Sequence, residues 1–188
     1  MKKFYSKQDL WSLFLMCAFP LHLWTLLLAF RDVSWVAERT NFADAIGVVS
    51  YGMIFAFLES LLLFLFAVLL GMLIPVRWGN GKRLSIISML VFMLTLWAMI
   101  SQLYMLQNWG IPRALLAFLV ESAHPLRNIF LIALVFVTPS AVLPVLMVYR
   151  SNKALETISD MIGRISLLTM FYLLLDFMAL IVVLFRNI

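Results

Sequence analysis

Five long apolar stretches, separated by short polar segments, organise the chain. They cover about residues 10–30, 46–74, 84–106, 129–149 and 165–185. A helix needs about 20 apolar residues to cross a hydrocarbon core of roughly 30 Å, and no stretch has the alternating pattern of a β-barrel strand. The pattern therefore predicts an all-α, polytopic integral membrane helical bundle with five transmembrane helices, which form a single membrane domain over residues 1–188.

A sixth apolar piece, at about residues 112–121, is too short to cross a bilayer. Pro112 suits the first turn of a helix, because the N–H that proline lacks has no partner in that turn. We expect a short helix on the outer interface, between the third and fourth spans. The alternative is an entrance helix over a cavity, buried by other parts of the protein.

The composition indicates that the solvent of this chain is lipid. Hydrophobic residues make up 65% of the chain and charged residues 12%, whereas soluble domains contain about 45–50% and 25%. A soluble fold cannot hide so much apolar surface from water. We therefore expect membrane lipid as a partner and no nucleic acid. The single Cys17 cannot form a disulfide within the chain.

The basic residues predict the orientation in the membrane. Nine of the fourteen Lys and Arg residues lie on the side that holds the N-terminus. These nine are Lys2, Lys3, Lys7, Arg77, Lys82, Arg83, Arg150, Lys153 and Arg164. Because cytoplasmic loops are enriched in Lys and Arg, we expect the N-terminus in the cytoplasm and the C-terminus outside (N-in/C-out). The expected location is the plasma (inner) membrane of a prokaryote.

Three ionisable residues, His22, Glu59 and Asp176, lie within the predicted spans. A charged group at the middle of a membrane costs at least ~2.5–3.5 kcal/mol, and such residues often face the protein interior and carry function. The helical rise from the ends of the spans allows all three to share one level in the outer half of the membrane. We predict that they bind a substrate or an ion. The alternative is a structural role, in which a backbone carbonyl or the Tyr172 hydroxyl satisfies each carboxyl group.

Small residues recur every four positions in the second span, at Gly52, Ala56 and Ser60. Small residues at this spacing let two membrane helices approach closely, so we predict that this stripe packs against another helix. A polar stripe on one face of the fifth span indicates a bundle with a polar seam. It consists of Ser166, Thr169, Tyr172 and Asp176.

Capping and proline residues predict where helices begin and bend. Asn41 is the predicted N-cap of the second helix, with Asp44 in the first turn, where the helix dipole favours a carboxylate. Pro139 and Pro144 are predicted to interrupt the fourth helix with a kink, because proline removes a backbone donor and clashes with the preceding turn. Residues 150–164 form a predicted polar loop.

The sequence offers little that is typical of catalysis or cofactor binding. Glu121 and His124 form an E-x-x-H pattern, which would place a carboxylate and an imidazole on one helix face and is a weak metal-site candidate. There is no H-E-x-x-H motif, no G-x-S-x-G motif, no phosphate-binding loop and no Rossmann fingerprint. We expect no metal and no cofactor, and the missing motifs favour a protein that is not an enzyme.

Three functions fit these features. The small size, the missing motifs and the small-residue stripe favour a non-enzymatic accessory or assembly subunit of a membrane complex, with a protein partner or a homo-oligomer. The shared depth of Glu59 and Asp176 favours instead a small transporter coupled to protons or cations. A third hypothesis is a lipid-modifying membrane enzyme with an outward-facing site.

Overall fold

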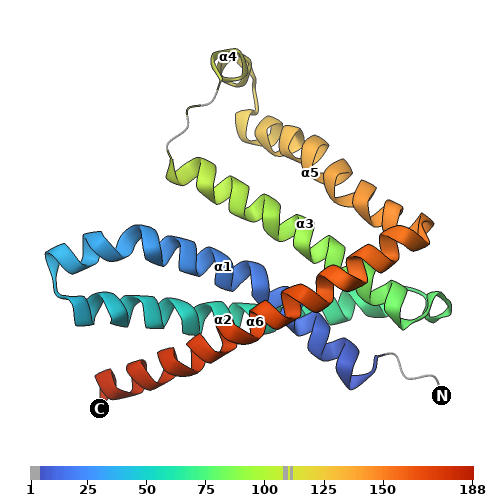
Figure 1. Cartoon of the computed structure of the whole chain (residues 1–188). Coiled ribbons are helices and arrows are strands. Elements are labelled where there is room, and N and C mark those ends of the chain that lie inside the picture. The colour runs from blue at the N-terminus through green and yellow to red at the C-terminus, as the bar shows by residue number, and fades with distance from the viewer. Residues whose placement is uncertain (1–4, 108–109, 111) are drawn as a thin grey trace.

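The computed structural model describes residues 5–107, 110 and 112–188, and this part of the chain is almost entirely helical (Figure 1). Its elements are α1 (Lys7–Arg39), α2 (Phe42–Leu73), the short 3-10 helix η1 (Val76–Trp78), α3 (Asn80–Leu106), α4 (Arg113–Glu121), α5 (Pro125–Arg150) and α6 (Asn152–Asn187). Five of these helices are long and apolar enough to cross a membrane, which confirms the predicted all-α bundle with five spans. Lys2 and Lys3, which contribute to the predicted orientation, lie outside the described residues.

The helices are longer than the apolar stretches that predict them. α6 begins at Asn152, so the predicted loop at residues 150–164 is wrong. Only Ser151 separates α5 from α6, and its hydroxyl accepts a hydrogen bond from the Ala154 N–H at 3.3 Å. The apolar pattern ends at the edge of the hydrocarbon, whereas backbone hydrogen bonds continue a helix into the headgroup region and water.

Side chains cap the first turns of α1 and α2. Asn41 is the N-cap of α2, as predicted, and its Oδ1 accepts a hydrogen bond from the Asp44 N–H at 2.8 Å. Ser6 and Asp9 form a reciprocal capping box at the start of α1. These bonds satisfy backbone N–H groups that the first turn of a helix leaves without a partner. They fix the points at which the α1–α2 hairpin begins and turns.

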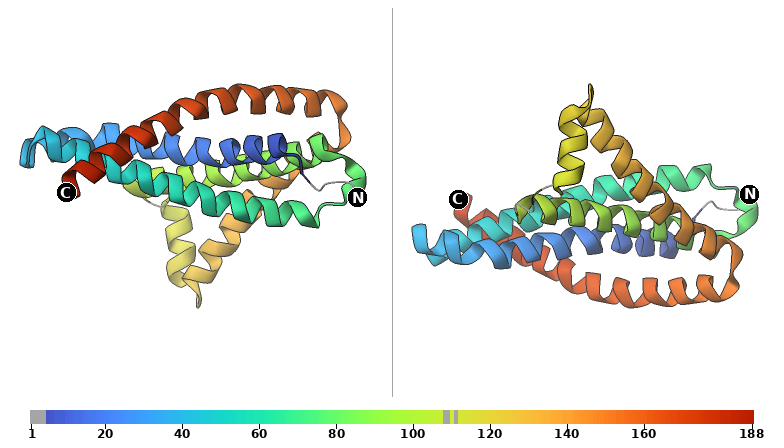
Figure 2. Two further views of the ribbon diagram at one scale, coloured as in Figure 1. Left: turned by 90° about the horizontal axis from the view of Figure 1, so that it is seen from below. Right: turned by 90° about the horizontal axis from the view of Figure 1, so that it is seen from above.

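α1 lies at the centre of the bundle. It packs against α2, α3 and α6, and 44% of its apolar segment is buried, against 6% for α5. α6 crosses the α1–α2 hairpin diagonally, and α3 runs beside α5 (Figure 1). α4 and the first part of α5 project from the other helices as a V, and we call α4 and α5 together the arm (Figure 2). The start of α1 and the end of α6 lie at opposite ends of the bundle, as expected for five helices that run alternately up and down (Figure 1).

The apolar core lies in the half of the bundle nearer the N-terminus, where α1 meets α2 and α3. It is formed by Leu13, Cys17, Ala67, Ile87 and Val91. Beside this core, the Phe14 ring makes edge-to-face contacts with the rings of Phe57 and Phe64. Such contacts add to the apolar burial and fix the register of α1 against α2. The register in turn sets the height of the polar residues further along both helices.

α5 is one continuous helix from Pro125 to Arg150, so the predicted interruption at Pro139 and Pro144 is wrong, whereas a kink at these prolines stays a prediction. Each proline removes one backbone donor, and the neighbouring turns keep the helix continuous. Between the two prolines, the Ser140 hydroxyl accepts a hydrogen bond from Trp97 Nε1–H at 2.6 Å. This bond joins α5 to α3 at about the middle of both helices.

Candidate functional site

Two of the three ionisable residues in the predicted spans meet in the structure. His22 of α1 and Asp176 of α6 are 154 residues apart in sequence, and their Nε2 and Oδ2 atoms lie 2.8 Å apart. His22 is completely buried, and the side chain of Asp176 is 11% exposed. A polar bond inside the bundle therefore joins α1 to α6.

The second ring nitrogen of His22 fixes the protonation of the ring. Nδ1 lies 2.7 Å from the carbonyl oxygen of Ala18, one turn earlier in α1. A carbonyl oxygen only accepts hydrogen bonds, so Nδ1 carries a proton. One further proton then lies between Nε2 and the Asp176 carboxyl group. The pair is either imidazolium with carboxylate or imidazole with carboxylic acid, and its net charge is zero in both forms.

The walls of this site come from the polar stripe of α6. The Tyr172 ring stacks on the His22 ring, with a centroid distance of 6.2 Å and an interplanar angle of 12°. Thr169 is fully buried one turn away. Asp176 Oδ1 and the Ser166 hydroxyl are buried and have no hydrogen-bond partner among the described residues. One carboxyl oxygen of the pair is therefore available for a proton or a further hydrogen bond.

The pair lies near the mid-height of the spans. His22 is one residue from the midpoint of α1, which corresponds to about 1.5 Å along the helix axis. α1 has 33 residues and is therefore about 50 Å long, so its centre lies within a hydrocarbon core of roughly 30 Å. This depth is the same whichever end of the bundle faces the cytoplasm.

Glu59 lies apart from this pair. It is exposed on α2 and lines a groove of about 370 Å³ between the second half of α1 and the first half of α2. Gln102 of α3 lines the same groove. Among the described residues, Glu59 makes no hydrogen bond or ion pair, and none joins it to Asp176. The structure thus pairs His22 with Asp176 and places the third ionisable residue at a separate surface.

The small-residue stripe of α2 faces α1 of the same chain. A Cβ at Gly52 would lie 3.3 Å from Thr25 Cγ2 of α1. Ala56 and Ser60 are buried, and the Ser60 hydroxyl donates to the Ala56 carbonyl at 2.6 Å. The small side chains therefore let α1 and α2 approach closely, as small residues do between membrane helices. A role of this stripe in contacts between chains stays a prediction.

Glu121 and His124 do not share a helix. α4 ends at Glu121, and His124 is the residue that precedes α5. The expectation of one common helix face is wrong because Pro125 starts a new helix, whose first turn needs no proline N–H. Both side chains are exposed. Among the described residues, no group of three or more His, Cys, Asp or Glu side chains is arranged to hold a metal ion.

No known protein family, curated protein or solved structure matches this chain.

The buried pair has the clearest chemistry of these features. A histidine and a carboxyl group that share one proton can pass it between them. Adding or removing one proton changes the net charge of the pair by one, in a place where lipid and protein stabilise charge poorly. Any such change must therefore be compensated nearby or must alter the contact between α1 and α6.

Sequence reasoning missed a buried arginine in the first turn of α3. Arg83 counts toward the predicted orientation, but its side chain is completely buried. Its Nη2 donates to the Gly71 carbonyl at 2.7 Å, and its guanidinium lies 4.8 Å from the centre of the Tyr5 ring. Burial raises the pKa of the Tyr5 hydroxyl above its usual value, and the charge of Arg83 opposes this shift. The feature of the sequence that could have indicated this burial is the position of Arg83 directly before the third apolar stretch.

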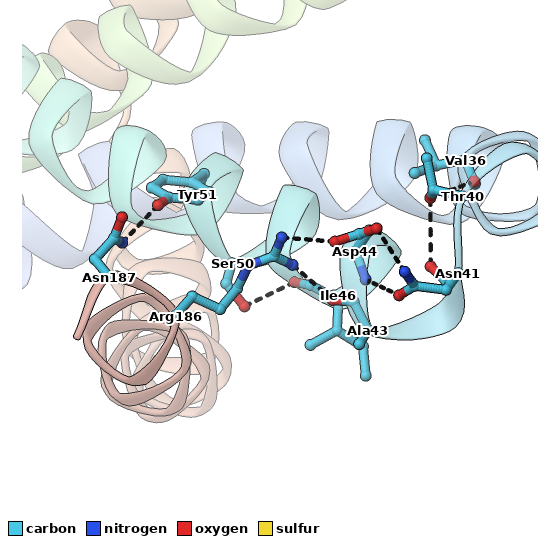
Figure 3. A network of polar contacts seen from close by, with 10 residues as sticks. All are labelled: Val36, Thr40, Asn41, Ala43, Asp44, Ile46, Ser50, Tyr51, Arg186 and Asn187. Atoms are coloured by element: carbon cyan, nitrogen blue, oxygen red, sulfur yellow. Dashed lines mark hydrogen bonds and ion pairs between the residues drawn. The ribbon is translucent and has the colours of Figure 1, made fainter.

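Sequence reasoning also missed the contacts that fasten the end of α6 to the start of α2 (Figure 3). Arg186 Nη2 lies 2.7 Å from Asp44 Oδ1, and Arg186 Nη1 donates to the Ala43 carbonyl at 2.8 Å. Asn187 Nδ2 donates to the Tyr51 hydroxyl at 2.7 Å. We call these contacts the C-terminal latch. No local spacing predicts them, because their partners are 142 and 136 residues apart in sequence.

Proposed function

We propose that this protein is a small proton-coupled carrier in which His22 and Asp176 bind the coupling proton. The observation that carries the proposal is the 2.8 Å contact between His22 Nε2 and Asp176 Oδ2 inside a bundle of five helices that are apolar and long enough to cross a membrane. Ionisable residues within spans commonly belong to proton relays or substrate paths. The expected substrate path and the proton site therefore lie in the same set of helices.

Stability alone is a weak reason for such a pair. Removing two charged groups from water costs more than their mutual attraction often returns, and apolar residues of similar volume frequently serve as well. Asp176 Oδ1 has no hydrogen-bond partner among the described residues, and an arrangement selected only for satisfied hydrogen bonds would not leave a carboxyl oxygen in this state. Both points favour a role in which the proton on the pair changes during the working cycle.

Loss of the shared proton supplies a coupling mechanism. His22 Nε2 and Asp176 Oδ2 would then both be acceptors, facing each other at 2.8 Å with no hydrogen between them. This arrangement is unfavourable, so the contact between α1 and α6 opens until a proton returns. A substrate that binds better to one of the two arrangements is thereby coupled to proton uptake or release, because each ligand shifts the equilibrium by its difference in affinity.

The direction of coupling depends on orientation. The excess of Lys and Arg on the N-terminal side supports a cytoplasmic N-terminus and an external C-terminus. It fits the plasma (inner) membrane of a prokaryote, and reporter fusions at each terminus test this orientation. Some reporters are active only in the cytoplasm. Activity of such a reporter at the C-terminus would contradict this orientation.

Infrared spectroscopy of the protein in lipid nanodiscs tests the proton site directly. We expect a carboxyl band that changes with pH in the wild type, disappears in Asp176→Asn and shifts in His22→Gln. Glu156→Gln is the matched control, since Glu156 is an exposed carboxylate near the other end of α6. A band that is identical in all four proteins would contradict a proton-binding role for the pair.

Proton flux provides the functional half of the test. Proteoliposomes that contain a pH-sensitive dye are exposed in turn to gradients of amines, amino acids, sugars and inorganic cations. We expect at least one gradient to drive proton movement in the wild type and in Glu156→Gln, but not in Asp176→Asn. Absence of proton movement with every member of this panel would contradict the carrier.

The second candidate is the accessory or assembly subunit, and a specific observation favours it. Only 6% of the apolar segment of α5 is buried, against 44% for α1, so α5 offers most of its surface to lipid, a partner helix or a second copy of the chain. Gentle extraction in native lipid, followed by mass spectrometry, tests this candidate. A stoichiometric protein partner that is lost in Phe136→Arg, on the exposed side of α5, would support it over the carrier.

A further inference from the structure

The groove that contains Glu59 has the size and the lining of a small-molecule site. Its volume of about 370 Å³ falls within the ~300–1,000 Å³ typical of such sites. The lining is mainly apolar, with Leu28, Val33, Val36, Val48, Val49 and Phe55 among its residues. The lining residues extend along α2 from Ala45 to Glu59, 14 positions that correspond to about 21 Å of helix. The groove is therefore long enough for an extended or bulky amphipathic molecule.

The charge of the groove has one sign. Its charged lining residues are Asp32 and Glu59, and none of the lining residues is Lys, Arg or His. Asp32 is paired with its neighbour Arg31, at 3.2 Å between Oδ1 and Nε, and both side chains are about half exposed. Glu59 has no such partner among the described residues. The uncompensated negative charge of the groove is thus that of Glu59.

The position of Glu59 makes this missing partner costly. Glu59 is 17 residues from the start of α2 and 14 from its end, so it lies about 2 Å from the midpoint of the helix. A carboxylate at that height is within the hydrocarbon core, where an isolated charge is unfavourable by at least ~2.5 kcal/mol. A cation bound beside it removes this cost, so Glu59 favours a positively charged occupant.

The other lining residues favour an organic cation over a metal ion. Metal ions such as Ca²⁺ need about six or more oxygen ligands, whereas the residues that line the groove near Glu59 are mainly apolar. Trp24 and Phe55 add aromatic rings to the walls, and such rings attract ammonium or phosphonium groups through cation–π interactions. The apolar walls in turn match a hydrophobic body attached to the charged group.

We propose that the groove between α1 and α2 binds amphipathic organic cations, with Glu59 as the counter-charge. Gly52 and Ala56 also form part of its lining. As the substrate class of the carrier, this proposal rests on the proposed function. As a binding site, it requires no proton coupling and can be measured separately.

Tetraphenylphosphonium and tetraphenylborate are the probes for this site, because they have nearly the same shape and opposite charge. Binding is measured by equilibrium dialysis against the full chain in phosphatidylcholine nanodiscs, with empty nanodiscs as the blank. We expect saturable binding of one tetraphenylphosphonium per chain, at least tenfold weaker in Glu59→Gln and intermediate in Glu59→Asp. Glu156→Gln is the control, since Glu156 does not line the groove, and it is expected to bind as the wild type does.

Two results would overturn the proposal. One is equal binding of tetraphenylphosphonium by wild type and Glu59→Gln, and the other is equally tight binding of tetraphenylborate, measured in a separate dialysis without the cation. A folded Glu59→Gln is expected, because the substitution removes a charge without a partner and keeps the shape of the side chain. Loss of cation binding in Glu59→Gln with an unchanged infrared carboxyl band of Asp176 separates this site from the proton site. If tetraphenylphosphonium binds as expected but no infrared carboxyl band changes with pH, the proposed carrier is contradicted and the proposed cation site is not.

Discussion

The α1–α2–α6 unit and the α4–α5 arm are built from similar apolar helices but are held in different ways. In the unit, the His22–Asp176 contact joins α1 to α6, and the C-terminal latch joins α6 to α2. The Trp97–Ser140 bond holds the arm to α3, and near the end of α5 the Tyr149 ring lies 4.6 Å from the Trp78 ring of η1.

Apolarity does not decide which helix is buried. α5 is more apolar than α1, yet far less of it is buried. Lipid tails are as apolar as Leu side chains, so membrane helices associate through close packing and interhelical polar bonds and not through avoidance of solvent. α1 has a small-residue neighbour in Gly52 and an ionisable residue in His22, whereas α5 offers mainly large apolar side chains. The residues that break the apolar pattern therefore determine the centre of the bundle.

Replacing one member of the His22–Asp176 pair is expected to lower the free energy of unfolding of the unit more than any other change. Asp176→Leu leaves His22 buried without its partner, which costs about 3–5 kcal/mol in the free energy of unfolding. The double variant His22→Leu/Asp176→Leu is expected to recover most of this loss, because no buried polar group remains unpaired. Unfolding by sodium dodecyl sulfate in mixed micelles measures both values.

Phe177→Leu is the control for this comparison, since Phe177 is the neighbour of Asp176 and is exposed on α6. We expect a change well below that of Asp176→Leu. Equal losses in the single and double variants would show that the site needs its polar groups for packing, and the contrast with the arm would then not depend on the pair.

Much of the fold follows from the sequence, because each span has to be long and apolar and because caps such as Asn41 act locally. The polar stripe of α6 is also predictable, since residues at helical spacing share a face. Partners are not. Whether Asp176 meets His22 or Glu59 depends on which helices are neighbours and on the rotation of each, and one sequence contains neither. The latch at Arg186 is hidden for the same reason.

A larger side chain at the α1–α2 contact should give the next largest effect. Gly52→Leu is expected to lower the free energy of unfolding by about 1–3 kcal/mol, because the added atoms meet Thr25 and overpack the interface. Gly163→Leu in α6 is the control, as nothing lies within 4 Å of a Cβ there. Its expected effect is neutral or a gain of up to about 1 kcal/mol from helix propensity. A greater loss for Gly163→Leu would reverse the comparison.

Removing the hydrogen bond between α3 and α5 tests whether the arm is a separate region. Ser140→Ala is expected to cost about 0.5–1.5 kcal/mol, because the Trp97 N–H loses its acceptor. Hydrogen exchange followed by mass spectrometry should become faster in α5 and stay unchanged in α1 and α2. Ser50→Ala is the control, since the Ser50 hydroxyl bonds to the Ile46 carbonyl of its own helix. Faster exchange throughout the bundle would mean that the two regions unfold together.

Breaking the C-terminal latch should lower the free energy of unfolding least of these changes. The Arg186 and Asp44 side chains are 39% and 37% exposed, and an exposed ion pair contributes about 0.2–1 kcal/mol. Arg186→Gln is therefore expected to lower the free energy of unfolding by no more than this, with a difference that shrinks as salt rises. Arg31→Gln is the control, because its partner Asp32 is the adjacent residue and the pair joins no two helices. A loss as large as that of Asp176→Leu would place the main fastening of α6 at its end, not in the middle of the membrane.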